Sequence, residues 1–160
     1  MYKDSYSTES NLLYTSASRK ERTLKITLIT NPSHQEKNVI TDGLWSHNAT
    51  FHPVEIEPFL LYCTDDDGNV AGGLIAQTWW GTLEIQYLWI AERIRGKGYG
   101  KELMSAAEAE ARNRNCHMAT VDTFDFQARS FYEKLGYKEY GSLSGYAHKF
   151  RRHYLAKEFT

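Results

Sequence analysis

Cysteine is scarce in this chain, which has two among its 160 residues, Cys63 and Cys116. Two cysteines are too few for the disulfide framework of a small secreted domain. Each of them lies in an apolar run of the kind that forms strands. We therefore expect two buried free thiols and a cytoplasmic protein.

An excess of charge of one sign is missing as well. The sequence has 19 Lys and Arg against 20 Asp and Glu, a net charge of −1. This balance argues against general binding to nucleic acid or to an anionic membrane. No apolar run approaches the ~20 residues of a membrane span, and residues 1–22 lack the apolar centre of a signal peptide. We expect neither a membrane nor a nucleic acid as partner.

Metal-binding patterns are absent from the sequence too. The six histidines show no ligand spacing. The acidic run Asp65–Asn69 lacks the spacing and the terminal Glu of a calcium loop, whereas its Gly68 suits a hairpin turn. No metal site is expected.

What the chain does have is the pattern of one α+β domain. Residues 1–21 are rich in Ser, Thr, Tyr and Lys, and we interpret them as an extension outside the fold. Residues 22–160 are expected to form one domain. Alternation predicts strands at 24–28, 56–63, 70–79, 83–90, 116–123, 137–141 and 147–155. Helices are predicted from residues 32–33 to near 48, at 101–113 and at 127–135. A meander followed by a β-α-β crossover gives a mixed, mostly antiparallel sheet with helices on it.

The predicted helix at 101–113 has a clear apolar stripe. Its apolar residues recur at spacings of three and four and are expected to face the core: Leu103, Met104, Ala107 and Ala111. Glu108 with Arg112 and Glu110 with Arg114 are expected as ion pairs on its outer face.

The most informative stretch lies between the strand at 83–90 and this helix. Glycines at positions 96, 98 and 100 let the backbone turn tightly and point its N–H groups at a ligand. The following helix adds unpaired N–H groups and the positive end of its dipole. Three cations flank the glycines: Arg93, Arg95 and Lys97. The stretch is chemically a pyrophosphate-binding loop.

Two other glycine-rich phosphate loops fail on spacing. A Walker loop needs Ser or Thr after its Gly-Lys pair, but Gly100 and Lys101 are followed by Glu102. A dinucleotide fingerprint would need glycine in place of Leu103. A tight turn without a ligand leaves the flanking cations unexplained.

Two runs carry a resemblance to a known family. Arg95–Gly100 reads R-G-K-G-Y-G, and Asp125–Tyr137 reads D-F-Q-A-R-S-F-Y-E-K-L-G-Y. The first resembles the R/Q-x-x-G-x-G/A loop of the GNAT N-acetyltransferases, and the second resembles that family's A-x-x-F-Y-x-K-x-G-F/Y element. The likeness extends more weakly over residues 23–157.

The resemblance implies a GNAT-like fold and acetyl-CoA as acyl donor. Backbone N–H groups of the loop would hold the pyrophosphate, the strand end at 88–90 would pair with the pantetheine amides, and an N–H near Leu88 would polarise the thioester carbonyl. Asp125 stands where the family pattern often has Asn. The residues so implied to contact the cofactor are Leu88, Ile90, Arg95, Gly96, Lys97, Gly98, Tyr99, Gly100, Lys101 and Asp125.

The resemblance also implies catalytic roles. Tyr132 matches the Tyr that protonates or hydrogen-bonds the departing CoA thiolate. We expect Ala128, Phe131 and Leu135 to form the core stripe of its short helix, which would leave Tyr132 turned toward the cleft. Glu84 is the candidate base for the amine. Asp122 and Asp125 are alternatives, unless one of them caps the helix near Gln127.

The expected function is acetyl transfer to the primary amine of a small molecule by direct attack in a ternary complex. A protein or peptide acceptor, a non-catalytic acyl-CoA sensor and a nucleotide-binding protein are the alternatives. Aromatic side chains could line the acceptor pocket and face a cationic amine: Trp45, Trp79, Trp80, Tyr87 and Trp89. A homodimer is an expectation from the resemblance alone.

Overall fold

The computed structural model describes residues 13–14 and 24–159. The chain divides into two units, one ending at His52 and the other beginning at Pro53. The described part of the first unit holds β1 (Leu13–Tyr14), β2 (Ile26–Thr27) and the helix α1 (His34–Asn48). Residues 1–12 and 15–21 of the expected extension lie outside the described residues.

The start of the chain differs from the sequence-based prediction. β1 lies within the segment interpreted as an extension and pairs antiparallel with β2. The strand expected at 24–28 shrinks to two residues, Ile26 and Thr27. Its apolar residues Leu24, Ile26 and Leu28 are exposed, so period-two alternation here does not mark a buried face. α1 begins as predicted, because Ser33 and Glu36 form a reciprocal capping box.

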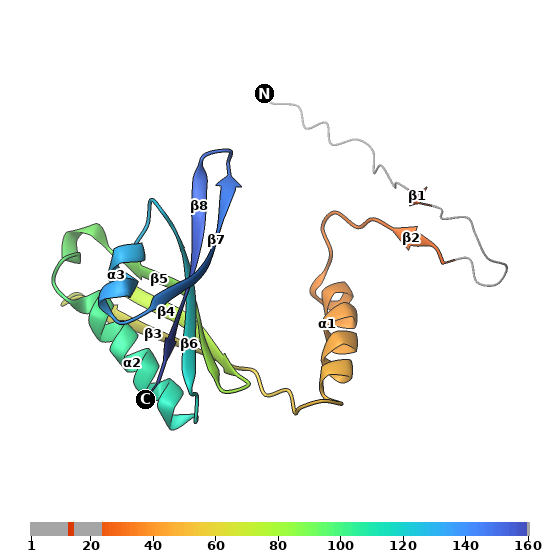
Figure 1. Cartoon of the computed structure of the whole chain (residues 1–160), viewed down its shortest axis with the longest axis horizontal. Coiled ribbons are helices and arrows are strands. Elements are labelled where there is room, and N and C mark those ends of the chain that lie inside the picture. The colour runs from red at the N-terminus through yellow and green to blue at the C-terminus, as the bar shows by residue number, and fades with distance from the viewer. Residues whose placement is uncertain (1–12, 15–23, 160) are drawn as a thin grey trace. The chain divides into compact units, whose positions relative to one another are not determined.

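The second unit is a six-stranded sheet with two α-helices (Figure 1). Its strands are β3 (Glu57–Thr64), β4 (Val70–Trp79), β5 (Thr82–Ile90), β6 (Met118–Phe124), β7 (Lys138–Tyr146) and β8 (Phe150–Glu158). Between them lie the 3-10 turn η1 (Glu92–Ile94), α2 (Tyr99–Asn113) and α3 (Arg129–Lys134). The strand order is β3-β4-β5-β6-β8-β7, and β5 with β6 is the parallel pair. The expected α+β class with a mixed, mostly antiparallel sheet is confirmed.

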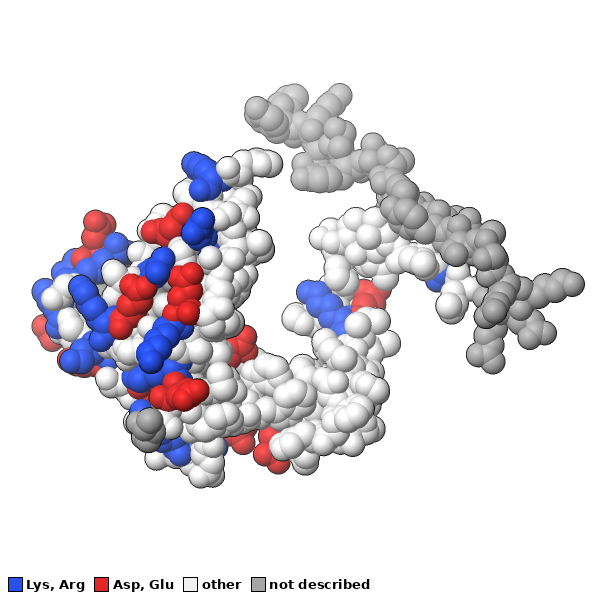
Figure 2. Space-filling view, viewed as in Figure 1, with Lys and Arg blue, Asp and Glu red and all other residues white. Residues whose placement is uncertain are grey.

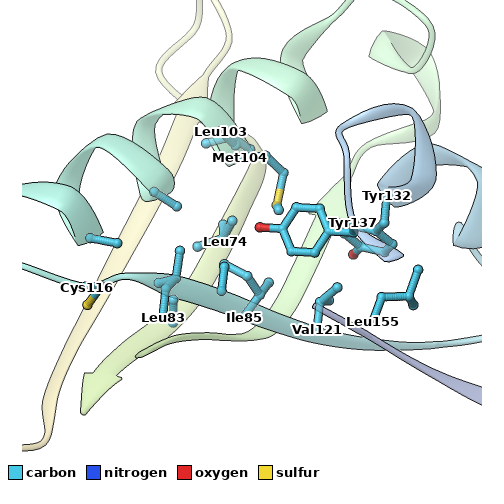
Figure 3. Close-up of a cluster of buried hydrophobic side chains, with 14 residues drawn as sticks. Leu74, Leu83, Ile85, Leu103, Met104, Cys116, Val121, Tyr132, Tyr137 and Leu155 are labelled. Carbon is cyan, nitrogen blue, oxygen red and sulfur yellow. The ribbon is translucent and has the colours of Figure 1, made fainter. Parts of the chain in front are cut away.

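The core of this unit lies between the sheet and α2 (Figure 3). All four residues of the predicted stripe on α2 are buried: Leu103, Met104, Ala107 and Ala111. They meet Leu74, Leu83, Ile85 and Leu155 from the strands. Cys116 joins the same cluster, Cys63 is half-buried, and both are free thiols. Burial raises the pKa of the Cys116 thiol.

The prediction of two ion pairs on the outer face of α2 is confirmed only in part. Glu110 pairs with Arg114 at 2.7 Å, as expected. The expected ion pair of Glu108 with Arg112 is also present, at 3.8 Å. Glu108 is only 6% exposed, however, and its carboxylate oxygens accept from Lys157 Nζ of β8 at 2.7 and 2.8 Å. The prediction that Glu108 faces outward is wrong, because a strand distant in sequence covers it and supplies its counter-ion.

β7 is longer than predicted, β8 begins and ends three residues later than predicted, and the two strands meet in a tight turn. Ala147 and His148 have φ of 47° and 61°, and Lys149 N–H donates to Tyr146 O. Two consecutive left-handed residues are typical of a type I′ hairpin turn, which usually contains Gly or Asn. The sequence therefore gave no local signal for this turn.

Candidate active site

The site lies where β5 and β6 separate. Their parallel pairing ends at Ile85 and Val121, and the register between β4 and β5 shifts at that point, leaving Gln86 without a partner in β4. Such a bulge bends a strand and increases its twist. Beyond it opens a cleft of about 930 Å³, lined by β5, the glycine loop, α3, β6 and Arg152 of β8.

The end of β5 presents unpaired backbone groups to this cleft. Ala91 N–H donates to Ala71 O at the end of β4. Because backbone groups alternate sides along a strand, those of Leu88 and Ile90 point the other way, toward the gap. Arg95 Nε donates to Ile90 O at 3.0 Å and fixes the loop to the strand end. The Leu88 N–H is thus directed toward the cleft.

The glycine loop connects η1 to the N-terminus of α2. Gly96 and Gly98 have φ of 76° and 95°, and a Cβ on either would meet no protein atom within 4 Å. Gly98 is the N-cap of α2, so the first N–H groups of that helix are unpaired and directed toward open space. A Cβ on Gly100 would lie 3.3 Å from Phe131 Cζ of α3. Two glycines therefore provide the turn, and the third permits close packing.

The charges around the loop differ from the simple expectation of three free cations. Arg93 forms an ion pair with Asp65 in the β3–β4 turn and does not line the cleft. Arg95 and Lys101 do line it, whereas Lys97 does not. Elsewhere on the visible face of this unit, Lys and Arg alternate with Asp and Glu (Figure 2). The positive potential at the cleft thus comes from two side chains and the helix end.

Tyr132 of α3 belongs to the core cluster (Figure 3). It also lines the cleft, as predicted, but it is only 6% exposed, and its place in the core was not predicted. Phe131, predicted as core, is only half-buried and also lines the cleft. Among the described residues, the Tyr132 hydroxyl has no hydrogen-bond partner. Burial, and secondarily the negative charge of Asp122, raise its pKa to about 12.

Glu84 and Asp125 do not line the cleft themselves, although each is next in sequence to a residue that does. Glu84 accepts from Gln77 Nε2 at 2.7 Å. Asp125 accepts from the Arg151 N–H at 3.1 Å. The expectation that Asp122 or Asp125 caps the short helix is wrong, since α3 begins after Ala128 without a side-chain cap.

A polar cluster that no sequence pattern predicted lies on the cleft wall. Asp122 of β6 accepts from Arg152 Nε of β8 at 2.5 Å. Tyr146 and Tyr154 adjoin Arg152, and their hydroxyls lie 3.4 Å apart. A separation of 30 residues between Asp122 and Arg152 leaves no local pattern to read.

Comparison with known proteins agrees with this geometry. The model of the acetyltransferase (GNAT) family matches residues 20–137, which include the glycine loop, α2, β6 and α3. The chain belongs to the GNAT acetyltransferase family. GNAT acetyltransferases use acetyl-CoA, so the resemblance seen in the loop and in the α3 segment is confirmed at the level of the family.

Individual relatives share both sequence and fold with this GNAT acetyltransferase. Blasticidin-S acetyltransferase of Streptomyces morookaense is 36% identical over 104 residues, 64% of this chain and 76% of the relative. An acetyltransferase of Agrobacterium fabrum is 36% identical over 110 residues, 68% of this chain and 80% of the relative. A crystal structure of a Bacillus cereus acetyltransferase matches with a TM-score of 0.74 and 28% identity, over 82% of this chain and 97% of the other.

The GNAT match ends at Tyr137, one residue before β7 begins. The β7–β8 hairpin, which carries Tyr146, Arg152 and Tyr154, lies outside it. Within residues 13–14 and 24–159, no helix is long and apolar enough to cross a membrane. The same residues contain no group of three or more potential metal ligands.

Proposed function

We propose that this enzyme transfers the acetyl group of acetyl-CoA to the primary amine of a small molecule. The observation that carries the proposal is the loop at Gly98, whose unpaired N–H groups open onto a cleft between two separating strands. The name of the S. morookaense relative, a blasticidin-S acetyltransferase, supports a small-molecule acceptor.

Acetyl-CoA fits the arrangement of polar groups along the cleft. The N–H groups of Lys97–Lys101 would bind the pyrophosphate at the end of α2. Arg95 holds the loop against β5, and Lys101 adds charge. The backbone groups of Leu88 and the N–H of Ile90 would bond the pantetheine amides as an added strand does. Asp125, already bonded to Arg151, is assigned only a supporting position near the cofactor.

The proposed reaction is a direct displacement. The amine nitrogen attacks the thioester carbon, the Leu88 N–H stabilises the oxyanion, and the C–S bond then breaks. One oxyanion donor contributes roughly 2.7–4 kcal/mol in well-studied enzymes. Overall, the nitrogen loses one proton and the CoA sulfur gains one. Because the amine attacks the thioester directly, the reaction needs no covalent enzyme intermediate.

Tyr132 is proposed to act on the departing sulfur. Because its pKa is raised to about 12, the hydroxyl is protonated at neutral pH and can donate. A thiol has a pKa of about 8.5, so full proton transfer from Tyr132 to the thiolate would be uphill. We therefore assign Tyr132 a hydrogen bond to the developing thiolate.

The amine must also lose its proton before it attacks. An alkyl ammonium with a pKa near ~10 costs about 4 kcal/mol to deprotonate at pH 7. Glu84 is proposed as the base, acting through water. Asp122 lines the cleft, but its Oδ1 already accepts from Arg152 Nε, so Glu84 is preferred to it.

The test is release of CoA thiol from acetyl-CoA over a panel of small amines and peptides. We expect turnover with small amines and a kcat about 10- to 100-fold lower in Tyr132→Phe, with the KM for acetyl-CoA little changed. Tyr140→Phe is the matched control, since Tyr140 is 66% exposed and outside the cleft. Glu84→Gln should lower turnover most at acidic pH.

Other outcomes would contradict the proposal. Turnover with peptides alone would assign the enzyme to protein acceptors. Binding of CoA without turnover of any acceptor would indicate a sensor, and thermal stabilisation by ATP or NAD but not by CoA would indicate a nucleotide-binding protein.

A further inference from the structure

The cleft has two walls that differ in chemistry. Buried Val121 and Thr123 of β6 face α2 and α3, so Asp122 and Phe124 face the opposite side of the sheet. Their cross-strand partners, Tyr154 and Arg152, lie on that same side. We call this the far face. The glycine loop and Tyr132 thus border the cleft from one face, and the Asp122–Arg152 pair borders it from the other.

The Arg152 guanidinium is held from several directions. Nε donates to Asp122 Oδ1 at 2.5 Å. The rings of Phe124 and Tyr154 each have their centroid 5.7 Å from Cζ, within range of a cation–π contact. The Tyr146 hydroxyl adds a hydrogen bond and raises the pKa of Arg152, as Asp122 does more strongly. Much of the entropy of ordering this side chain is therefore lost before any ligand binds.

Arg152 nevertheless keeps part of its donor set accessible. Asp122 occupies Nε and the Tyr146 hydroxyl bonds another part of the guanidinium, yet the side chain is still 35% exposed where it lines the cleft. The terminal amino groups of a guanidinium form the planar edge that matches the two oxygens of a carboxylate. An arginine used only for stability would not need to be both oriented and open to a cleft.

We propose that Arg152 binds a carboxylate carried by the acceptor amine, so that the preferred substrates are amino-carboxylate compounds. This inference rests on the proposed function and names its substrate class. Arg152 carries a single positive charge and already shares it with Asp122, so a singly charged carboxylate meets less repulsion at this site than a phosphate dianion. The rings of Phe124 and Tyr154 would flank the rest of the acceptor.

The position of Arg152 in the chain agrees with a role in specificity. It lies on β8, beyond the residues that the family model matches. The loop and α3, which serve the common acyl donor, lie inside that match. A residue that selects the acceptor is expected where the family pattern stops.

The experiment uses pairs of amines in which one member carries a carboxylate and the other carries the neutral carboxamide in its place. The wild-type enzyme should show a lower KM for the carboxylate member. In Arg152→Gln, that KM should rise about 10- to 100-fold, while the carboxamide changes less than about threefold. Arg152→Lys keeps the charge without the planar edge and should recover only part of the loss. Arg151→Gln is the matched control, because Arg151 bonds Ser144 and does not line the cleft.

The outcomes separate this inference from the proposed function. Equal KM values for both members of each pair in the wild type, or an equal loss for both in Arg152→Gln, would overturn the carboxylate site and leave the acetyltransferase intact. No turnover of any pair would overturn the proposed function instead. In that case, calorimetry measures the binding of the same pairs to the CoA-loaded protein. Tighter binding of the carboxylate member to the wild type but not to Arg152→Gln would support the carboxylate site, and equal binding of both members to the wild type would overturn it.

Discussion

At the scale of single residues, Gly98 has the clearest physical requirement in the chain. Its φ of 95° lies where side chains are strained, and open space surrounds the place where a Cβ would stand. The conformation directs the helix N–H groups outward and leaves room for a phosphate group. Substitution at this position should therefore affect stability and cofactor binding through separate causes.

We expect Gly98→Ala to lose about 1–2 kcal/mol of stability through backbone strain. The same change should raise the KM for acetyl-CoA about tenfold or more, because the new methyl lies where the pyrophosphate is proposed to bind. Urea unfolding and initial-rate kinetics measure the two effects. Gly141→Ala is the control, since no atom lies within 4 Å of its Cβ position and its φ is not left-handed. An unchanged KM in Gly98→Ala would contradict the proposed phosphate site.

At the scale of secondary-structure elements, one buried ion pair connects α2 to β8. Lys157 donates to both carboxylate oxygens of Glu108. The Glu108 side chain is only 8% exposed. Lys157 therefore takes the place of water as the main partner of its carboxylate. Arg112, at 3.8 Å, offers partial compensation. The pair helps to fix the position of α2, and the glycine loop lies directly before the N-terminus of that helix.

Removing the cation should leave Glu108 buried and poorly paired. We expect Lys157→Met to lower the free energy of unfolding by about 2–4 kcal/mol at pH 7. Lys138→Met is a control on the neighbouring strand, where the residue is exposed. The double variant Lys157→Met with Glu108→Gln should recover part of the loss, because the unpaired charge is gone. Equal stability of Lys157→Met and wild type would show that Arg112 suffices.

At the scale of the whole molecule, buried tyrosines connect folding to alkaline pH. Burial raises the pKa of Tyr132 to about 12 and raises that of Tyr137 as well. In the unfolded chain both titrate near ~10. Above that pH the unfolded state releases protons that the folded state keeps, so stability falls as pH rises.

We expect the contribution of these tyrosines to the free energy of unfolding to be level below pH ~10 and to fall between pH ~10 and ~12. Each buried tyrosine contributes up to about 1.4 kcal/mol per pH unit in that range. Tyr132→Phe should flatten the decline, whereas Tyr140→Phe, at an exposed position, should not. Denaturant unfolding at a series of pH values measures both. A decline of the same slope in Tyr132→Phe and wild type would mean that Tyr132 titrates alike in both states.

How well the sequence predicts the structure depends on how far apart along the chain the interacting residues lie. Gly96 and Gly98 adopt the left-handed conformations that their spacing predicts, and the α2 stripe is buried as its period requires. The burial of Glu108 and of Tyr132 and the bond of Asp125 to Arg151 were not predicted, because a strand of the C-terminal hairpin or packing against the core decides their surroundings. The turn at Ala147 and His148 was missed because neither residue is a usual left-handed residue.

The sequence by itself determined the family, the glycine loop and the helix that follows, because these depend on backbone freedom and periodicity within a few consecutive residues. Only the tertiary structure decided which side chains border the cleft. Separation of β5 from β6 opens it, and pairing of β6 with β8 brings Arg152 beside Asp122. That contact follows from the order of strands in the sheet, which local patterns do not specify.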